Sequence, residues 1–213
     1  MLGSLFETSV AKTLTSLRRL TIIDCGGLKH IVTQARVKRN EKENMVEDGH
    51  DFQTHLSMFL NLDMLYITSC NLLQHIFTES FVGGMVKSND TRSKETSNPL
   101  SPQPCFPKLT TLIVEQCHKL KYLTSVSAPN DFSNLELLVI SGATELLQFN
   151  ETGKSEVELL ELKVLIFIDL SKFSQETQFL NVKHRIVRNC PKLSLTTTTT
   201  LEEIKQNFHD LGK

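Results

Sequence analysis

The fold of this 213-residue chain is decided by the stretch FPKLTTLIVEQCHKLKYL, residues 106–123. The same apolar offsets recur in copies that begin at Leu14, Phe59 and Phe132, with Ala143 in place of the cysteine in the last of these. In a chain that is only 39% hydrophobic, chance does not produce this register four times. A fixed apolar register on this scale predicts a repeat architecture. Its apolar positions in the quoted copy are Phe106, Leu109, Leu112, Val114, Cys117, Leu120 and Leu123.

Two weaker copies follow, one from Leu159 without the cysteine and one from Phe179 with Arg185 where a core leucine is expected. The repeats thus start near residues 14, 59, 106, 132, 159 and 179, and the middle steps fall within the roughly 20–29 residues of leucine-rich repeats. The long steps leave room for loop insertions at 32–55 and 78–105, whose charged or proline-rich composition disfavours burial. We expect one α/β domain over residues 1–213, a leucine-rich-repeat solenoid. Arg185 and the short last step put regular stacking near the C-terminus in doubt.

Each repeat should place a short strand at its Leu-x-Ile/Val centre. Equivalent strands would pair in parallel, with core leucines on one face and a concave surface on the other. The convex side should be irregular and partly helical. Helices should cap both ends, over residues 2–14 and, after a run of threonines, over 200–212, where Thr200 and Glu203 form a candidate capping box. The predicted strands are residues 19–23, 64–68, 111–115, 137–141, 164–168 and 184–188.

Composition bears on the compartment and on the class of partner. The net charge is −1 with both signs mixed, which gives no reason to expect nucleic acid or an anionic membrane as a partner. No apolar run approaches the roughly 18 residues of a membrane span, and the N-terminus does not resemble a signal peptide. We therefore expect a cytoplasmic protein. Four of the five cysteines share one repeat position, where a reduced thiol packs as a small hydrophobic group and can make a weak hydrogen bond at the strand end.

Few patterns in the sequence suggest chemistry. Two Cys-x4-His pairs, which begin at Cys25 and Cys70, have residue types that bind zinc, but Tyr122 takes the place of the histidine in the third repeat. The Cys117-His118 pair suggests a nucleophile, yet a cysteine at a buried repeat position is inert. No phosphate-binding glycine loop and no hydrolase or zinc-protease motif occurs. We predict a non-enzymatic chain without a cofactor or metal site.

The surface of the predicted sheet is the remaining place for function. Residues that alternate with the core positions should line the concave face, and many of them are apolar, which suggests a protein-binding groove. The alternative is that β-branched residues simply make good strands and pack on their cross-strand neighbours. The sequence leaves both interpretations open. The candidate protein-binding residues are Tyr66, Ile113, Glu115, Val139, Ile166, Ile168, Ile186 and Arg188.

The repeat Leu-x-x-Leu-x-Ile-x-x-Cys-x-x-Leu-x-x-Ile, with variants such as FPKLTTL at 106–112 and CPKL at 190–193, resembles a known family. It is similar to the C-terminal leucine-rich repeats of plant intracellular immune receptors of the coiled-coil nucleotide-binding (NB-LRR) disease-resistance class. The segment from Ser9 to Val32 and the charged insert after it resemble the same class. The resemblance implies recognition of a pathogen effector or host protein, and restraint of a nucleotide-binding domain of the same receptor. The chain has no nucleotide-binding motif, so it resembles a fragment or truncated member, and no ATPase activity is implied.

A second family offers an alternative. The substrate-recognition leucine-rich-repeat proteins of F-box ubiquitin ligases also carry a cysteine at this repeat position. Their repeats continue with Ile-Thr-Asp and a convex helix, and neither that tripeptide nor an F-box-like segment occurs in this sequence. The immune-receptor resemblance therefore remains the stronger expectation, and in both cases the role is to bind another protein.

Overall fold

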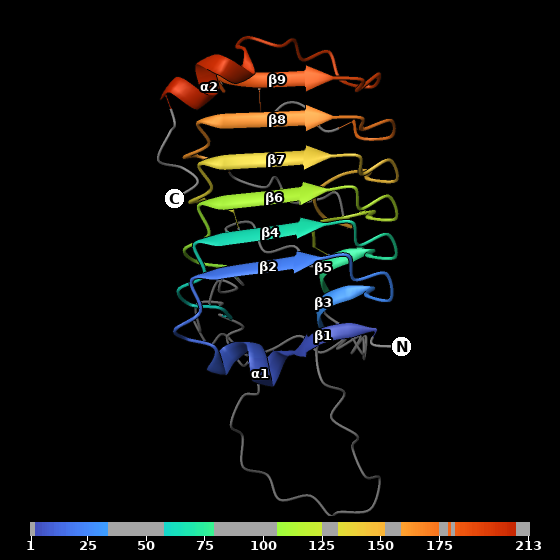
Figure 1. Ribbon diagram of the computed structural model, residues 1–213, viewed down its shortest axis with the longest axis vertical. Helices are drawn as coiled ribbons and strands as arrows, with labels where there is room; N and C mark the ends of the chain where they lie inside the picture. Colours follow the sequence, from blue (N-terminus) through green and yellow to red (C-terminus); the bar gives the residue numbers. More distant parts are fainter. Residues whose placement is uncertain are drawn as a thin grey trace, which may run out of the picture.

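The computed structural model describes residues 3–33, 58–78, 106–124, 132–151, 159–174, 179 and 182–207. Its main feature is a sheet of six parallel strands in the order β2-β4-β6-β7-β8-β9 (Figure 1). Equivalent repeat positions lie opposite one another between all neighbouring strands. All six predicted strands are confirmed with their bounds. They are β2 (Arg19–Ile23), β4 (Met64–Thr68), β6 (Thr111–Glu115), β7 (Leu137–Ser141), β8 (Val164–Ile168) and β9 (His184–Arg188).

A second, smaller sheet is also parallel and has the strand order β1-β3-β5. Its strands are β1 (Ser4–Glu7), β3 (His30–Thr33) and β5 (His75–Thr78). The chain passes from β2 to β3 and from β4 to β5, so the first two repeats contribute one strand to each sheet. Single bridges from Phe77 to Thr124 and from Thr124 to Asn150 continue this alignment into the next two repeats. The molecule is therefore a mixed α/β structure with parallel strands in two sheets.

The second sheet corrects the expectation of a partly helical side opposite the main sheet. The segments His-Ile-Val-Thr of β3 and His-Ile-Phe-Thr of β5 are rich in β-branched and aromatic residues, and they lie in register. Parallel pairing satisfies their backbone N–H and C=O groups, so a helix has no advantage there. Residues 32, 33 and 78, which the sequence assigned to the insertions 32–55 and 78–105, belong to these strands. The rest of both predicted insertions lies outside the described residues.

The N-terminal segment also differs from the predicted helix over residues 2–14. Ser4–Glu7 form β1, which pairs with β3, and only α1 (Thr8–Thr13) is helical. Tertiary pairing has overridden the helical spacing of the apolar residues in this segment, as is common for short elements. Ala11 of α1 is buried in the core, and its carbonyl accepts a hydrogen bond of 3.3 Å from the Phe59 N–H. The helix therefore packs on the start of the second repeat.

The main core collects the leucine, cysteine and phenylalanine positions of the repeat from both sheets. Leu65, Leu112, Leu138 and Leu165 lie at one position of four neighbouring strands, and none is more than 1% exposed. Burying one such side chain fully contributes about 1.5–3 kcal/mol to stability. The repeat register is thus the register of the core.

The end of every strand in the main sheet has the same turn, which explains the cysteine position. The residue after each strand has a positive φ between 52° and 67°, and asparagine, aspartate or glycine fills four of the six places. Where a cysteine follows, its thiol donates to the carbonyl two residues earlier, at 3.3–3.5 Å. The predicted weak hydrogen bond at the strand end is confirmed. The residues with positive φ are Asp24, Ser69, Gln116, Gly142, Asp169 and Asn189.

The C-terminal edge of the main sheet stays regular despite Arg185, so the regular stacking that the sequence left in doubt extends to β9. Arg185 lies opposite Leu165 in the register. Its guanidinium donates to the carbonyls of Phe179 and Val182, both at 3.2 Å, and to the carbonyl of Thr196 at 2.9 Å. The long side chain thus hydrogen-bonds to backbone carbonyls at the end of the stack, where no further leucine layer follows in the described sheet.

The threonine run covers the outer edge of β9. Thr197 Oγ1 accepts from the Val187 N–H and donates to the Val187 carbonyl, both at 2.9 Å, and the Thr198 N–H donates to the Arg185 carbonyl at 2.9 Å. Helix α2 (Leu201–Asn207) follows. The predicted capping box is confirmed, because Thr200 N–H donates to Glu203 Oε2 at 2.7 Å and Glu203 N–H donates to Thr200 Oγ1 at 3.2 Å. Residues 208–212 of the predicted helix lie outside the described residues.

Candidate functional site

The eight candidate residues lie together on the outer face of the main sheet, which we define as the face turned away from the main core. One column crosses the middle of five neighbouring strands, and a second column lies beside it near the carboxyl ends of the strands. The strict strand register produces both columns, because equivalent residues of successive repeats are direct neighbours. The first column is Tyr66, Ile113, Val139, Ile166 and Ile186, and the second includes Glu115, Ile168 and Arg188.

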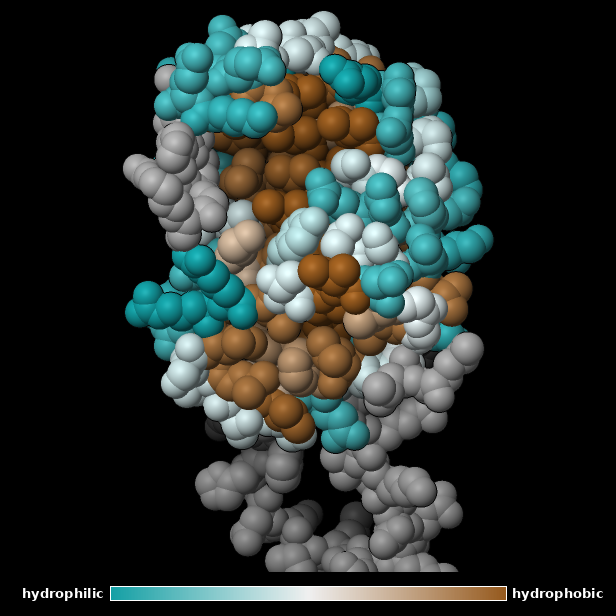
Figure 2. Space-filling model, viewed as in Figure 1, coloured by the Kyte–Doolittle hydropathy of each residue, from teal (hydrophilic) through white to brown (hydrophobic). Residues whose placement is uncertain are grey.

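Burial of the first column increases toward the C-terminal end of the sheet. Ile113, Val139 and Ile166 are half-buried, whereas Ile186 is only 8% exposed. Figure 2 shows apolar surface gathered over β7, β8 and β9, beside α2. Half-buried aliphatic side chains in a continuous strip can be covered further by a protein partner, which would remove more apolar area from water.

The other end of the face is more polar. The Tyr66 hydroxyl donates a 2.9 Å hydrogen bond to the Glu115 carboxylate on the neighbouring strand. This hydrogen bond and the negative charge of Glu115, together with partial burial, raise the pKa of Tyr66 above its ordinary value. The pair fixes the tyrosine ring across β4 and β6. The outer face is therefore polar at Tyr66 and Glu115, and its aliphatic column begins with Ile113 of β6 and continues over β7 to β9.

A satellite apolar cluster on the outer face was missed in the sequence. Ile204 of α2 packs on Val164 and Ile186, with Leu137 and Ile166 around them. Leu137 and Val164 occupy the first position of their strands, where β6 has a threonine. This change from a polar to an apolar residue at the first strand position is visible in the sequence and could have indicated the cluster. The prediction of a helix that covers the last repeat is therefore only partly right, because Ile204 of α2 lies on the sheet face rather than over the end of the main core.

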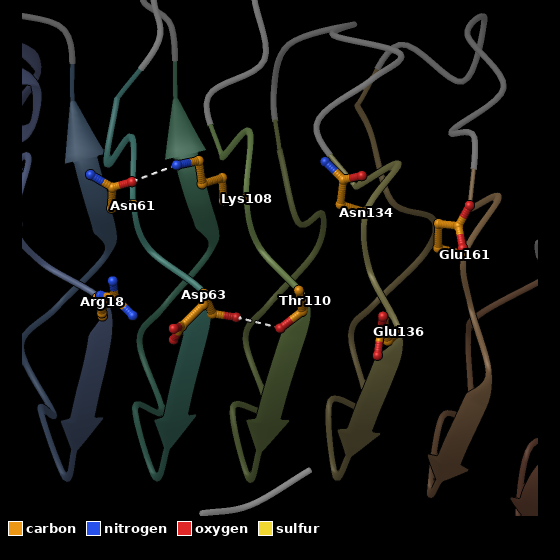
Figure 3. Close-up of a pocket in the computed structure, with 8 residues that line it drawn as sticks. All are labelled: Arg18, Asn61, Asp63, Lys108, Thr110, Asn134, Glu136 and Glu161. Atoms are coloured by element: carbon orange, nitrogen blue, oxygen red, sulfur yellow. Dashed lines mark hydrogen bonds between the residues drawn. The ribbon is translucent and has the colours of Figure 1, made fainter. Parts of the chain in front are cut away.

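A polar depression of about 520 Å³ runs beside the apolar columns, at the amino ends of the strands (Figure 3). Lys108 Nζ donates to Asn61 Oδ1 at 2.7 Å, and Thr110 Oγ1 donates to the Asp63 carbonyl at 3.1 Å. Charged residues of both signs line it, as in the polar rim of a protein interface. The lining residues are Arg18, Asn61, Asp63, Lys108, Thr110, Asn134, Glu136 and Glu161.

The environment of the repeat cysteines indicates a packing role rather than a chemical one. Burial raises the pKa of Cys117 to about 12, and it also raises the pKa of Cys70 and Cys190 above the ordinary value. A thiol with a raised pKa is protonated at neutral pH and is a poor nucleophile. The suggested role of Cys117 as a nucleophile is therefore not supported by its environment.

The histidines of the two Cys-x4-His pairs stack with Tyr122 along the second sheet. The His30 and His75 rings lie 5.6 Å apart, and the His75 and Tyr122 rings are also 5.6 Å apart. Burial, followed by the charge of Lys29, lowers the pKa of His30, and burial lowers that of His75. Among the described residues, no group of three or more histidine, cysteine, aspartate or glutamate side chains is placed to hold a metal ion. The shared spacing thus reflects the stacking of one repeat position.

Comparisons with known proteins supply no family for the chain. No protein-family model, no curated protein and no solved structure matches it. In the part of the chain that the structure describes, no helix is long and apolar enough to cross a membrane. What the chain does must therefore be argued from the outer face itself.

Proposed function

We propose that this chain is a non-catalytic module for protein–protein recognition and that its outer sheet face binds the partner. The observation that carries the proposal is the strip of half-buried aliphatic residues across β6, β7 and β8, chiefly Ile113, Val139 and Ile166. Main-core residues on the same strands are at most 1% exposed, so the strip is not part of that core. An apolar strip with a polar rim matches the anatomy of protein interfaces.

The proposal extends to the fold and to the biological setting. The repeat spacing and the matching register of the six strands support a leucine-rich-repeat solenoid with the outer face as its concave surface. The resemblance of the repeat to plant intracellular disease-resistance receptors supports a role in innate immunity inside the cell. The partner would then be a pathogen effector or a host protein, and a nucleotide-binding domain of the same receptor would be a further contact.

A capture experiment with paired variants tests this function. The tagged full chain is incubated with plant leaf extract, retained proteins are identified, and the affinity of each purified candidate is measured. Val139→Lys and Ile166→Lys should each weaken binding of the partner at least about tenfold, because a charge would be placed at the centre of the contact. A lysine stem can lie along the sheet with its ammonium group in water, so the fold should survive.

Leu147→Lys is the matched control. Leu147 is also aliphatic and is 37% exposed, but it lies in the turn region after β7, where its N–H donates to the Lys121 carbonyl. This variant should bind the partner as the wild type does. Unchanged binding in both Val139→Lys and Ile166→Lys would show that the partner binds elsewhere and that the outer face is not the recognition surface.

A further inference from the structure

Helix α2 shows what kind of group the apolar part of the outer face accepts. Ile204 projects from α2 onto Val164 and Ile186 and is only 8% exposed. Half-buried Leu137 and Ile166 surround this contact. We call the sheet residues that contact Ile204 its seat, and they come from β7, β8 and β9. Figure 1 shows α2 beside β9, and Figure 2 shows the apolar surface continuing from it over the neighbouring strands. The chain thus places one aliphatic side chain of a helix on the face proposed for recognition.

The hold on α2 is weak. The helix has seven residues, and helices of that length are marginal without outside support. Among its residues with described side chains, only Ile204 is buried, while Leu201 is 46% exposed. The second support is the capping box, in which the Glu203 carboxylate accepts from Thr199 Oγ1 at 2.8 Å and from Thr200 N–H at 2.7 Å. Few buried contacts mark an element that opens locally at low free energy.

The threonine run keeps the chain attached when α2 leaves. Thr197 and Thr198 bond to the backbone of β9 at Val187 and Arg185, and none of these bonds involves α2. The Arg185 guanidinium also holds the Thr196 carbonyl at 2.9 Å. Release of α2 therefore needs the loss of the Ile204 contact, while the covered edge of β9 stays intact.

The covered edge also decides which secondary structure a partner can present there. An extended peptide would have to add a strand to the edge of the sheet, and at β9 the threonine run already bonds to those backbone groups. A helix that lies across the face needs no backbone bonds from the sheet and only an apolar stripe of its own. Helix α2 already demonstrates this mode of contact.

We propose that α2 is an internal occupant of the recognition face, and that the partner is an amphipathic helix whose aliphatic side chain replaces Ile204 against Val164 and Ile186. This inference rests on the proposed function, since it names the partner's chemistry at the same face. A partner then binds only the fraction of molecules in which α2 has moved away. The apparent affinity is lowered by that fraction, and release of α2 raises it.

A peptide supplied in trans tests the seat directly. The probe is a fluorescently labelled peptide with the sequence of residues 199–213, and its binding to the full chain is followed by fluorescence anisotropy. Ile204→Asp in the full chain should bind the peptide at least about tenfold more tightly than the wild type, because its own helix no longer fills the seat. Glu203→Ala, which removes the capping box without touching the apolar contact, should also tighten binding.

Two controls keep the result specific. Glu202→Ala changes an exposed carboxylate of the same helix outside the capping box and should bind the peptide as the wild type does. A peptide with its own Ile204→Asp change should not bind. Circular dichroism of each chain variant establishes that it is folded. Equal affinity of wild type and Ile204→Asp, or no binding to either folded protein, would overturn the inference.

The outcome is separable from that of the proposed function. If Val139→Lys loses the captured partner while Ile204→Asp leaves the peptide affinity unchanged, only the role of α2 is wrong. If the partner binds equally to Val139→Lys and Ile166→Lys while the peptide result holds, α2 docks as described but the partner uses another surface.

Discussion

The two ends of the main sheet are closed by different means. At the C-terminal end, the threonine run binds backbone groups of β9, and the Arg185 guanidinium donates to the Thr196 carbonyl of that run. Leu195 is only 8% exposed there. At the N-terminal end, β2 is the edge strand of the described sheet, and the repeat positions Leu14, Leu17 and Leu20 are only half-buried. Figure 2 shows a second apolar area around α1 at this end. We call the C-terminal end the closed end, because hydrogen bonds cover its edge strand, and the N-terminal end the open end, because its apolar cover is incomplete.

This contrast separates two requirements of a stacked fold. A terminal strand has unpaired backbone groups that invite association with other chains, and side-chain hydroxyl groups can satisfy them. A terminal layer also has core side chains that water can reach, and only apolar cover reduces that cost. The C-terminal end meets both requirements, and the N-terminal end meets the second only in part.

The largest expected effect compares an interior core leucine with its equivalent at the open end. Leu112→Ala should lower the free energy of unfolding by about 2–5 kcal/mol, because the side chain is fully buried. Leu20→Ala should cost only about 1 kcal/mol, since a half-buried side chain loses less transfer free energy. Urea denaturation measures both. Equal losses would mean that the N-terminal layer is as closed as the interior, and a loss under about 0.5 kcal/mol for Leu112→Ala would contradict the register.

At the closed end, Arg185→Ala should cost about 1–3 kcal/mol, because the carbonyls of Phe179, Val182 and Thr196 lose their donor. Arg185→Lys should restore only part of this, since a single ammonium cannot reproduce the fork of the guanidinium. Thermal denaturation follows both changes. Arg188→Ala, which removes an exposed arginine of the same strand, is the control and should be close to neutral. A fully stable Arg185→Ala would show that the hydrogen bonds of the guanidinium do not stabilise this end.

The histidine stack gives the second sheet a predicted dependence of stability on pH. His30 and His75 have lowered pKa values in the fold, so the unfolded chain binds more protons as the pH falls. Their contribution is fully present above the ordinary pKa of 6.5 and declines below it. Urea denaturation at pH 8 and at pH 5.5 should show the decline, and His30→Phe with His75→Phe should reduce it. If the exposed His118→Gln variant reduces it as much, the stack is not the cause.

The smallest expected effect is in thiol reactivity. In a Cys105→Ser background, the half-buried Cys25 at the open end should react with a thiol reagent before Cys70 and Cys117, which are 0% exposed. Mass spectrometry of the labelled peptides gives the order under native conditions. Simultaneous labelling of all three would mean that the interior opens as readily as the end.

The sequence alone was sufficient to predict the strands of the main sheet and their faces. Each repeat has the same apolar register, and side chains alternate between the two faces along its strand. Leu138 and Val139 could be assigned to opposite faces of β7 from that alternation alone. The placement of all eight candidate residues on one face followed from the same register.

The rest depended on contacts between segments distant in the sequence. Four-residue strands such as His30–Thr33 are too short to show a period, and they form because equivalent segments stack beside them. The turn toward the face that places Ile204 on Val164 is set by the threonine run, whose bonds to β9 have no sequence signature. The face proposed for recognition was thus easier to predict from the sequence than the position of α2 on it.

The central claim is that neighbouring residues of one strand have different roles: Leu138 stabilises the core, and Val139 contacts the proposed partner. The most direct measurement is urea denaturation of Leu138→Lys and Val139→Lys beside the wild type. Leu138→Lys should not fold, because the charge would enter a core position that is 1% exposed. Val139→Lys should stay within about 1 kcal/mol of the wild type, because the lysine stem can lie along the sheet with its ammonium group in water. If Val139→Lys unfolds as well, the outer strip is structural and the account is wrong.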